Sequence, residues 1–143
     1  MTAARPAQPI KLYNFALSGH AHRVRLFLTM LDLPFEVIEV DLAGKANRQP
    51  PFLARNAFGQ VPVIEDGDAT LADSNAILVY LNERYAAEPG RWLPRDALGA
   101  ANVQRWLSVS AGQLAFGPAL ARVCVLFGRP MDPATMARAE ALL

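Results

Sequence analysis

The apolar and polar positions in the first third of the chain follow two different periods. Residues 11–15 and 35–40 alternate between the two kinds of side chain, which is the pattern of a strand with one buried face. Between them, apolar residues recur three and four positions apart over residues 21–31, which indicates an amphipathic helix. A strand, a helix and a second strand in this order predict a parallel pair joined by a right-handed crossover.

A β-hairpin is predicted for residues 61–72. β-Branched side chains fill its first strand, and the Asp66-Gly67 dipeptide is typical of a tight two-residue hairpin turn. The short side-chain oxygen of Asp73 or Ser74 is suited to cap a helix that starts directly afterwards. The chain therefore passes from an antiparallel strand pair straight into a helix that can cover the sheet.

These segments, with a short helix that ends near residue 55, give the order β-α-β-α-β-β-α. The predicted fold class is α/β: a thioredoxin-like domain with a mixed four-stranded sheet, one face of which is covered by a helix over residues 73–85. We assign this domain to residues 10–86. Residues 1–9 are small and proline-rich, and are predicted to form a disordered tail.

The second half of the chain is predicted to be helical. Its proline and glycine content marks residues 87–95 as a linker. A long apolar helix is expected over about 96–127, with a bend at its internal glycines. A further helix is expected from Asp132 to Leu143, because an aspartate followed by proline is a typical helix start.

Composition fits a globular protein and argues against several classes of function. The 143 residues are 52% hydrophobic and 19% charged, and the formal net charge of +1 gives no reason to expect nucleic acid or an anionic membrane as a partner. Cys124 is the only cysteine, so no internal disulfide is expected, and its apolar neighbours predict a buried thiol. No signal-peptide core and no apolar run of ~18 residues occurs, so we expect a cytoplasmic protein without a membrane span.

Pro62 stands where the first hairpin strand begins. Proline cannot donate a hydrogen bond to a sheet, so it is confined to the first residue, the edge or a bulge of a strand. The spacing alone favours an ordinary trans peptide bond at an edge strand. A cis bond is the alternative, and it would turn the backbone N–H and C=O of Val61 outward, ready for an extended ligand.

Residues 58–63, Phe-Gly-Gln-Val-Pro-Val, and residues 71–77, Leu-Ala-Asp-Ser-Asn-Ala-Ile, resemble the glutathione-binding half of the cytosolic glutathione S-transferase family. The resemblance is to bacterial, serine-type members of the family, and it extends over roughly residues 10–143. The resemblance implies that residues 96–143 are the truncated start of an all-helical C-terminal domain. It also implies a homodimer in the full-length family form.

The same resemblance implies roles for five residues around the hairpin. The bond before Pro62 would be cis, and the backbone of Val61 would pair with the cysteinyl part of glutathione. Asp73 would take the γ-glutamyl ammonium, and Ser74 with the helix N-terminus would take the γ-glutamyl carboxylate. Gln60 would belong to the same binding set. A plain helix cap is the alternative role for Asp73 and Ser74.

Ser18 is the candidate catalytic residue. It follows the first strand at the start of a helix, and Ser18–Arg25 resembles the serine-type catalytic loop of the family. A hydroxyl there could donate a hydrogen bond to the glutathione thiolate and lower the pKa of the thiol. The alternative is a helix cap and nothing more. Ser18 and Ala21 stand where thioredoxins carry their two cysteines, so disulfide exchange is excluded for this loop.

Basic residues that follow the second strand are candidates for the glycyl carboxylate of glutathione. The resemblance places Arg48 first and Lys45 second, although Asn47 stands where some subgroups carry a histidine. His20 and His22 are too few for a zinc site, so no metal is expected. His20 is left as a residue that borders the ligand, without a catalytic role.

We therefore expect a glutathione S-transferase that joins the glutathione sulfur to a small hydrophobic electrophile, a chemistry typical of detoxification. Glutathione would be the co-substrate, Ser18 would stabilise its thiolate, and the identity of the electrophile is not encoded in these residues. Side chains exposed on a partial helical domain also predict self-association; these are Trp106, Phe116, Val123, Leu126 and Phe127.

Two other functions stay open. One is a non-catalytic glutathione-fold module that binds a ligand or a regulatory partner. The other is a glutathione-dependent isomerase of the maleylacetoacetate type, which ranks lower because its family loop reads Ser-Ser-Cys, whereas Gly19 and His20 follow Ser18 here.

Overall fold

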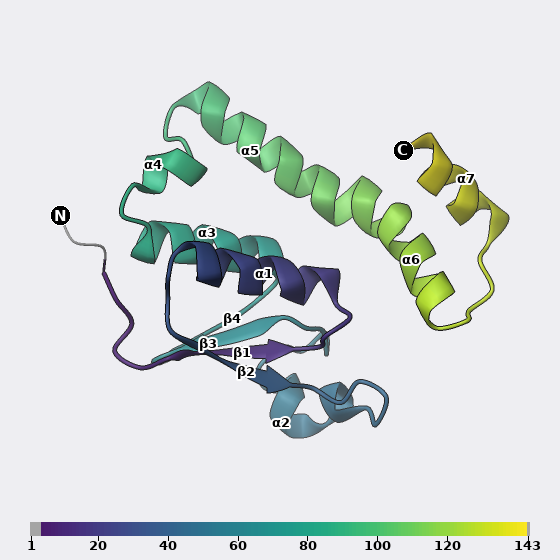
Figure 1. Cartoon of the computed structure of the whole chain (residues 1–143), viewed down its shortest axis with the longest axis horizontal. Coiled ribbons are helices and arrows are strands. Elements are labelled where there is room, and N and C mark those ends of the chain that lie inside the picture. The colour runs from purple at the N-terminus through teal and green to yellow at the C-terminus, as the bar shows by residue number, and fades with distance from the viewer. Residues whose placement is uncertain (1–3, 143) are drawn as a thin grey trace. The chain divides into compact units, whose positions relative to one another are not determined.

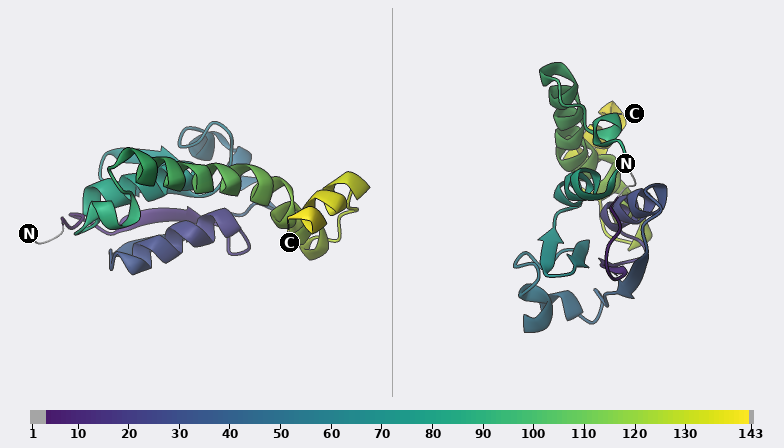
Figure 2. Two further views of the ribbon diagram at one scale, coloured as in Figure 1. Left: turned by 90° about the horizontal axis from the view of Figure 1, so that it is seen from above. Right: turned by 90° about the vertical axis from the view of Figure 1, so that its left-hand side faces the viewer.

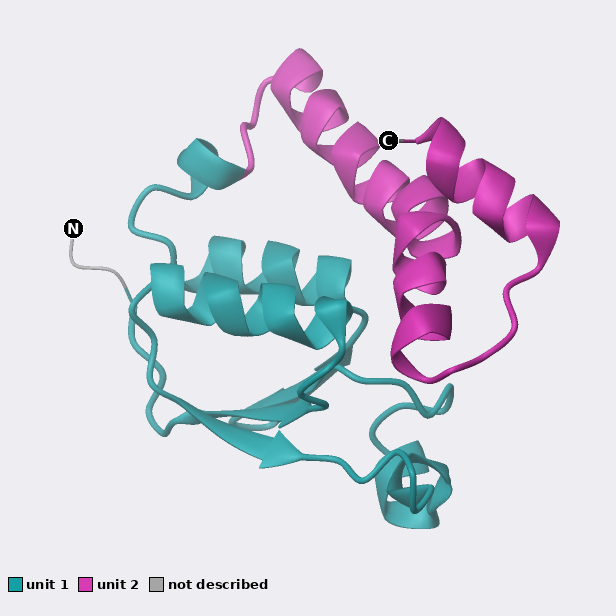
Figure 3. Cartoon of the chain, turned by 45° about the vertical axis from the view of Figure 1, so that its right-hand side comes forward, with its two compact units in different colours: residues 1–92 teal, residues 93–143 magenta. Residues whose placement is uncertain are grey.

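The computed structural model describes residues 4–142, and the chain divides into two compact units, residues 1–92 and 93–143, shown in teal and magenta in Figure 3. Of the predicted tail, residues 4–9 contain no helix or strand, and residues 1–3 lie outside the described residues. Each unit is described by itself.

The first unit is built on a four-stranded sheet in the order β2-β1-β3-β4 (Figure 1). The central strand β1 pairs in parallel with β2 and antiparallel with β3, and β3 pairs antiparallel with β4. The predicted mixed sheet is therefore confirmed. The strands are β1 (Ile10–Asn14), β2 (Phe35–Glu39), β3 (Val63–Asp66) and β4 (Ala69–Ala72).

Two long helices, α1 (Gly19–Met30) and α3 (Ser74–Tyr85), lie side by side on one face of the sheet, and the short helix α2 (Pro50–Leu53) lies on the other (Figures 1 and 2). The order β-α-β-α-β-β-α of a thioredoxin-like domain is thus confirmed. A 3-10 turn, Ala46–Arg48, precedes α2.

Alternation along the strands separates two cores, because successive side chains of a strand point to opposite faces. Buried side chains of β1, β3, α1 and α3, with Leu33 from the α1–β2 connection, form the larger core on the helix-covered face. They are Ile10, Leu12, Val24, Phe27, Leu28, Leu33, Ile64, Ile77, Leu81 and Tyr85. The smaller core lies on the α2 face and consists of Tyr13, Val40, Phe52 and Val63. The smaller core fixes the segment that leads from β2 through α2.

The predicted linker over residues 87–95 contains a short helix, α4 (Pro89–Trp92). The ring of Trp92 meets Phe27 of α1 edge-to-face, with 5.7 Å between the ring centroids. Residues up to Trp92 thus pack with the first unit. The boundaries 10–86, 87–95 and 96–143 remain a prediction of where separate domains begin and end.

The second unit consists of α5 (Ala97–Val109), a π-helical segment (Ser110–Leu114), α6 (Pro118–Leu126) and α7 (Pro133–Ala141). The long helix predicted over about 96–127 is therefore divided, and a bend predicted at its internal glycines is confirmed. Gly117 leaves helical geometry with φ −115° and ψ −105°, and α6 restarts at Pro118. The last predicted helix ends at Ala141, and Leu143 lies outside the described residues.

The apolar side chains of the second unit are only partly covered. Cys124 is buried, as predicted. Of the five side chains expected at its surface, Val123 is half-buried and the others are exposed: Trp106, Phe116, Leu126 and Phe127. Within residues 4–142 no single helix has both the length and the apolar character to cross a membrane; residues 97–114 and 118–126, bent by 42° at their break, pass that test only when taken together.

Candidate functional site at one edge of the sheet

Strand register brings the predicted site segments to one edge of the sheet. Tyr13 lies opposite Val63, and Val63 lies opposite Ala72, so the carboxyl ends of β1 and β4 flank the amino end of β3. The parallel pairing of Asn14 with Glu39 adds the carboxyl end of β2. The loops that continue from these four strand ends carry all seven residues predicted to form the site.

Ser18 follows β1 and is the N-cap of α1. Its Oγ accepts a hydrogen bond from the backbone N–H of Ala21 at 3.2 Å. Capping extends α1 back to Gly19, two residues before the predicted start at Ala21. The cap uses Oγ as an acceptor, and the hydroxyl hydrogen is not part of it, so a cap and a donor to a ligand are compatible roles.

The peptide bond between Val61 and Pro62 is cis, so the trans form favoured by spacing alone is wrong and the form implied by the family resemblance is confirmed. Pro62 is buried and Val61 is half-buried. Among residues 4–142, the backbone of Val61 makes no hydrogen bond to another residue. A backbone donor and acceptor are therefore left for an extended ligand, which can bind by adding a strand-like pairing.

Asn56, which sequence reasoning missed, organises the loop before Pro62. Its Nδ2 donates to the carbonyl of Gln60 at 2.8 Å, and its Oδ1 accepts from the N–H of Phe58 at 3.1 Å. Asn56 is itself buried. Asparagine is typical of such turns, because its side chain mimics backbone hydrogen bonds; that signal was available in the sequence.

Asp73, rather than Ser74, is the N-cap of α3. Its Oδ1 accepts from the N–H groups of Asn75 and Ala76 at 2.9 and 3.0 Å. Its φ of +72° is uncommon for a residue other than glycine. Ser74 is buried in the first turn of the helix, next to N–H groups that favour an anion. The two residues thus lie together at a helix N-terminus, as the binding role requires.

Arg48 lies in the segment between β2 and α2, where its guanidinium donates to the carbonyl of Phe58 at 3.2 Å. Asn47 donates to the carbonyl of Gly59 at 2.7 Å, so the residue at the variable family position is a brace between two loops. Lys45 is exposed and has a left-handed backbone, with φ +59°. Arg48 is thereby placed beside the Gln60–Pro62 loop, whereas no contact of this kind is seen for the Lys45 side chain among the described residues.

His20, which was predicted only to border the ligand, and Arg23, which carried no predicted role, join the two helix N-termini. Nδ1 of His20 lies 2.8 Å from Nη2 of Arg23 and 3.4 Å from Oγ of Ser74. Arg23 also donates to Oδ1 of Asn75. Burial and the nearby positive charge of Arg23 lower the pKa of His20, and the carboxylate of Asp73 opposes that shift. We call these four side chains, His20, Arg23, Ser74 and Asn75, the α1–α3 bridge.

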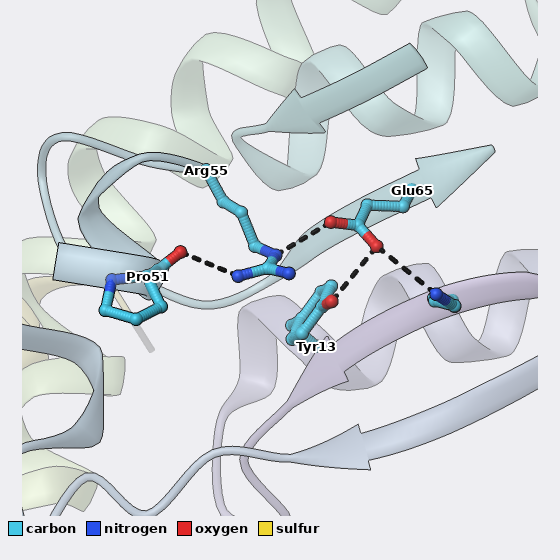
Figure 4. A network of polar contacts seen from close by, with 5 residues as sticks. Tyr13, Pro51, Arg55 and Glu65 are labelled. Atoms are coloured by element: carbon cyan, nitrogen blue, oxygen red, sulfur yellow. Dashed lines mark hydrogen bonds and ion pairs between the residues drawn. The ribbon is translucent and has the colours of Figure 1, made fainter. Parts of the chain in front are cut away.

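A second polar network fixes α2 against the sheet (Figure 4). Arg55 donates from Nε to Glu65 of β3 at 2.7 Å and from Nη1 to the carbonyl of Pro51 at 2.6 Å. The hydroxyl of Tyr13 donates to the other carboxylate oxygen of Glu65 at 3.0 Å. Burial acts to raise the pKa of Glu65, but these hydrogen bonds outweigh it and the pKa is lowered. No group of three or more His, Cys, Asp or Glu side chains that could hold a metal ion occurs among the described residues.

The sequence of the chain matches a known family of proteins over the residues that form this sheet edge. The model of the glutathione S-transferase N-terminal domain matches residues 12–89. Glutathione S-transferase 3 of Zea mays is 44% identical over 103 residues, which are 72% of this chain and 46% of the maize protein. The chain thus spans about half the length of this relative.

Solved structures agree with the sequence comparison. A Drosophila mojavensis glutathione transferase homologue with bound glutathione superposes with a TM-score of 0.81 at 30% identity, over 93% of this chain and 61% of that chain. A Bombyx mori glutathione transferase superposes with a TM-score of 0.83 over 96% of this chain and 64% of that chain, and at 22% identity it supports the fold alone. These relatives come from plants and insects, so the expected bacterial form gains no support.

Proposed function

This chain belongs to the glutathione S-transferase family, and from that premise we propose that it binds glutathione at the described sheet edge and activates the glutathione sulfur for transfer to a small hydrophobic electrophile. The observation that carries the proposal is the convergence of two features at one edge: an unpaired Val61 backbone and the α3 N-terminus with Asp73 and Ser74. The first suits the peptide part of glutathione, and the second suits its charged amino-acid end.

The γ-glutamyl end of glutathione would be held at the start of α3. Asp73 uses Oδ1 for both cap bonds, which leaves Oδ2 to pair with the ammonium group. The Ser74 hydroxyl and the first N–H groups of α3 would take the carboxylate. The backbone of Val61 would pair with the cysteinyl residue, next to Gln60 and Pro62. The exposed guanidinium of Arg48 would meet the glycyl carboxylate.

Ser18 would act on the sulfur. Its hydroxyl hydrogen can be donated to the thiolate while Oγ still caps α1, and the partial positive charge of the helix N-terminus favours the same anion. Both effects lower the pKa of the bound thiol, so a larger share of glutathione is present as the nucleophilic thiolate at neutral pH.

Wider properties follow from the family premise and are also part of the proposal. We infer a cytoplasmic protein, a homodimer in the full-length family form, and an electrophile pocket completed by helices of the C-terminal domain. Glutathione is the only small-molecule co-substrate we propose, with no metal.

Calorimetry with glutathione and a conjugation assay with 1-chloro-2,4-dinitrobenzene test this function. Ser18→Ala should bind glutathione within about threefold of the unaltered chain and lose roughly 100-fold in turnover, the usual size for one donor to a developing anion. Ser18→Thr keeps the cap and the donor and should restore most turnover, whereas Ser18→Asp keeps the cap without the donor and should not. Equal turnover in Ser18→Ala and the unaltered chain would remove Ser18 from the mechanism.

A non-catalytic glutathione-binding module is the second candidate. It is favoured by one observation: the Oγ of Ser18 already has a structural partner in the N–H of Ala21. Glutathione binding without turnover of any electrophile in a panel would support this module over the transferase. An absence of glutathione binding would contradict both.

A further inference from the structure

The α1–α3 bridge connects the two helix N-termini through one ring nitrogen. Nδ1 of His20 lies 2.8 Å from Nη2 of Arg23 on its own helix and 3.4 Å from Oγ of Ser74 on α3. Arg23 continues the connection to Asn75, one residue further along α3. His20 is thus the point at which the Ser18 loop contacts the residue proposed to hold the γ-glutamyl carboxylate.

The chemistry of Arg23 fixes the state of His20. A guanidinium can only donate hydrogen bonds, so Nδ1 must accept and the ring must carry its proton on Nε2. The Oγ of Ser74 lies farther from the same nitrogen, at 3.4 Å, and its hydroxyl hydrogen stays available to a bound carboxylate. Protonation of the ring would place an N–H at Nδ1, directly facing the positive charge of Arg23, and the contact with Arg23 could not persist.

The groups that face His20 come from both packed helices. Arg23 of α1 and burial favour the neutral ring, while Asp73 at the start of α3 favours the protonated ring, and together they lower the pKa of His20. Arg23 itself is half-buried, and burial lowers its pKa, with Asp73 opposing. The folded protein therefore stabilises neutral His20 near pH 7.

We propose that His20 is a positioning residue for glutathione: its neutral Nδ1 accepts from Arg23 and so fixes the contact of Arg23 with Asn75 beside Ser74, and protonation of the ring releases Arg23. This inference rests on the proposed binding of glutathione at Ser74. Its consequence is that glutathione binding weakens as the pH falls below 6.5, the ordinary pKa of histidine, toward the lower pKa of His20.

The test uses S-methylglutathione and calorimetry between pH 5.0 and 7.5. The methylated sulfur cannot ionise, and the carboxylates and amine of the ligand keep their charge in this range. The sequence contains two histidines, so His22→Asn is the matched control for His20→Asn. Asparagine at position 20 can place an acceptor oxygen near the position of Nδ1 but cannot titrate there.

The affinity of the unaltered chain and of His22→Asn should fall about tenfold from pH 7.5 to pH 5.0, the size expected for one lost hydrogen-bonded contact. His20→Asn should bind within about threefold of the unaltered chain at pH 7.5 and show no such fall. His20→Ala should bind about tenfold more weakly at both pH values. Unchanged affinity in His20→Ala, or a pH-dependent fall that survives in His20→Asn, would overturn the inference.

A measurement without ligand separates this inference from the proposed function. Nitrogen-15 NMR of the ligand-free chain should show the Nε2–H tautomer for His20 and a pKa for that ring below 6.5, the ordinary value of histidine. Arg23→Gln should raise the pKa of His20, because the facing positive charge is removed. An Nδ1–H tautomer overturns the inference whether or not glutathione binds. The expected NMR result without any glutathione binding overturns the proposed function and the role of His20 in it, and leaves the bridge as a structural contact.

Discussion

Arg55 and Glu65 join α2 to β3 through a hydrogen-bonded ion pair of 2.7 Å, although ten residues separate them in the chain. Glu65 is the centre of this contact, because its carboxylate also accepts from Tyr13 at 3.0 Å. The pair thereby holds the start of the loop that leads to Gln60, Val61 and Pro62 against the sheet.

Replacement of Glu65 by alanine should lower the free energy of unfolding by about 1–2 kcal/mol, because two hydrogen bonds to a partly buried carboxylate are lost. Lys11→Ala is the matched control, since Lys11 lies 3.8 Å from the same carboxylate but is half-exposed, and it should change stability by less than about 0.5 kcal/mol. Urea unfolding at pH 7 measures both. Equal effects of the two substitutions would contradict a special role for the Arg55 and Tyr13 contacts.

The same carboxylate predicts a pH dependence. The pKa of Glu65 is lower in the folded chain than its ordinary value of 4.5, so the unfolded chain binds more protons in the intervening range. The contribution of Glu65 to the free energy of unfolding is therefore fully present above pH 4.5, and it is lost as the pH falls through the lowered pKa. The difference in unfolding free energy between the unaltered chain and Glu65→Gln should shrink from pH 7 to pH 3, as measured by urea unfolding. A difference that stays constant would show that Glu65 keeps its ordinary pKa.

Asn56→Ala should be among the more damaging polar substitutions in the first unit. The substitution removes the side-chain amide that donates to the carbonyl of Gln60 and accepts from the N–H of Phe58. Since this residue is buried, the loss should lower the free energy of unfolding by about 2–3 kcal/mol. Affinity for S-methylglutathione should also fall, because the loop before Val61 loses its fixed shape. Asn102→Ala, on an exposed helix position in the second unit, should alter neither quantity. An Asn56→Ala chain as stable as the unaltered chain would contradict this account.

Regular elements of the first unit were predictable from the sequence because they depend on local periods. The alternation over residues 11–15 and the turn signal at Asp66-Gly67 predicted β1 and the β3–β4 hairpin with little help from distant residues. The two turn residues are Gly67 and Asp68, one position later than predicted, because Asp66 still pairs with Ala69. The site segments were found for a different reason, namely that two short motifs match a family at its spacing.

Contacts between distant residues were not predictable in this way. Tyr13 and Glu65 are 52 residues apart, and nothing near either residue indicates the other. His20 meets Ser74 only because α1 and α3 pack side by side. The bend at Gly117, in contrast, was predicted from the glycine itself, although its backbone geometry, φ −115° and ψ −105°, was not.

Gly59 and Gly67 form a natural pair for testing crowding in the binding loop. Both have positive φ, +61° and +57°, so alanine is strained at either position. A Cβ at Gly59 would lie 2.8 Å from the carbonyl oxygen of Asn47 and 3.0 Å from Nη1 of Arg48, whereas at Gly67 nothing lies within 4 Å. Gly67→Ala should lower the free energy of unfolding by about 1 kcal/mol. Gly59→Ala should lower it by more, and should also weaken the binding of S-methylglutathione. Thermal unfolding measures the loss of stability, and calorimetry measures the affinity for the ligand. An equal loss of stability in the two variants would show that the backbone at Asn47 can move away from a Cβ at position 59 without loss of stability.

Asp73 has two roles that one substitution can separate. Asparagine keeps a side-chain oxygen for the N–H groups of Asn75 and Ala76 and is the kind of residue that tolerates positive φ, so Asp73→Asn should stay within about 0.5 kcal/mol of the unaltered chain. It removes the charge proposed to pair with the γ-glutamyl ammonium, so affinity for S-methylglutathione should fall about tenfold or more.

Asp96 provides the control, because it caps α5 in the second unit through the N–H of Gly99 at 2.8 Å. Asp96→Ala should lower the stability of its helix by about 1 kcal/mol and leave ligand affinity unchanged. Calorimetry and urea unfolding of the three chains give the comparison. If Asp73→Asn binds the ligand as tightly as the unaltered chain, the carboxylate of Asp73 is a helix cap alone, and the ammonium of glutathione must be held elsewhere on the sheet edge.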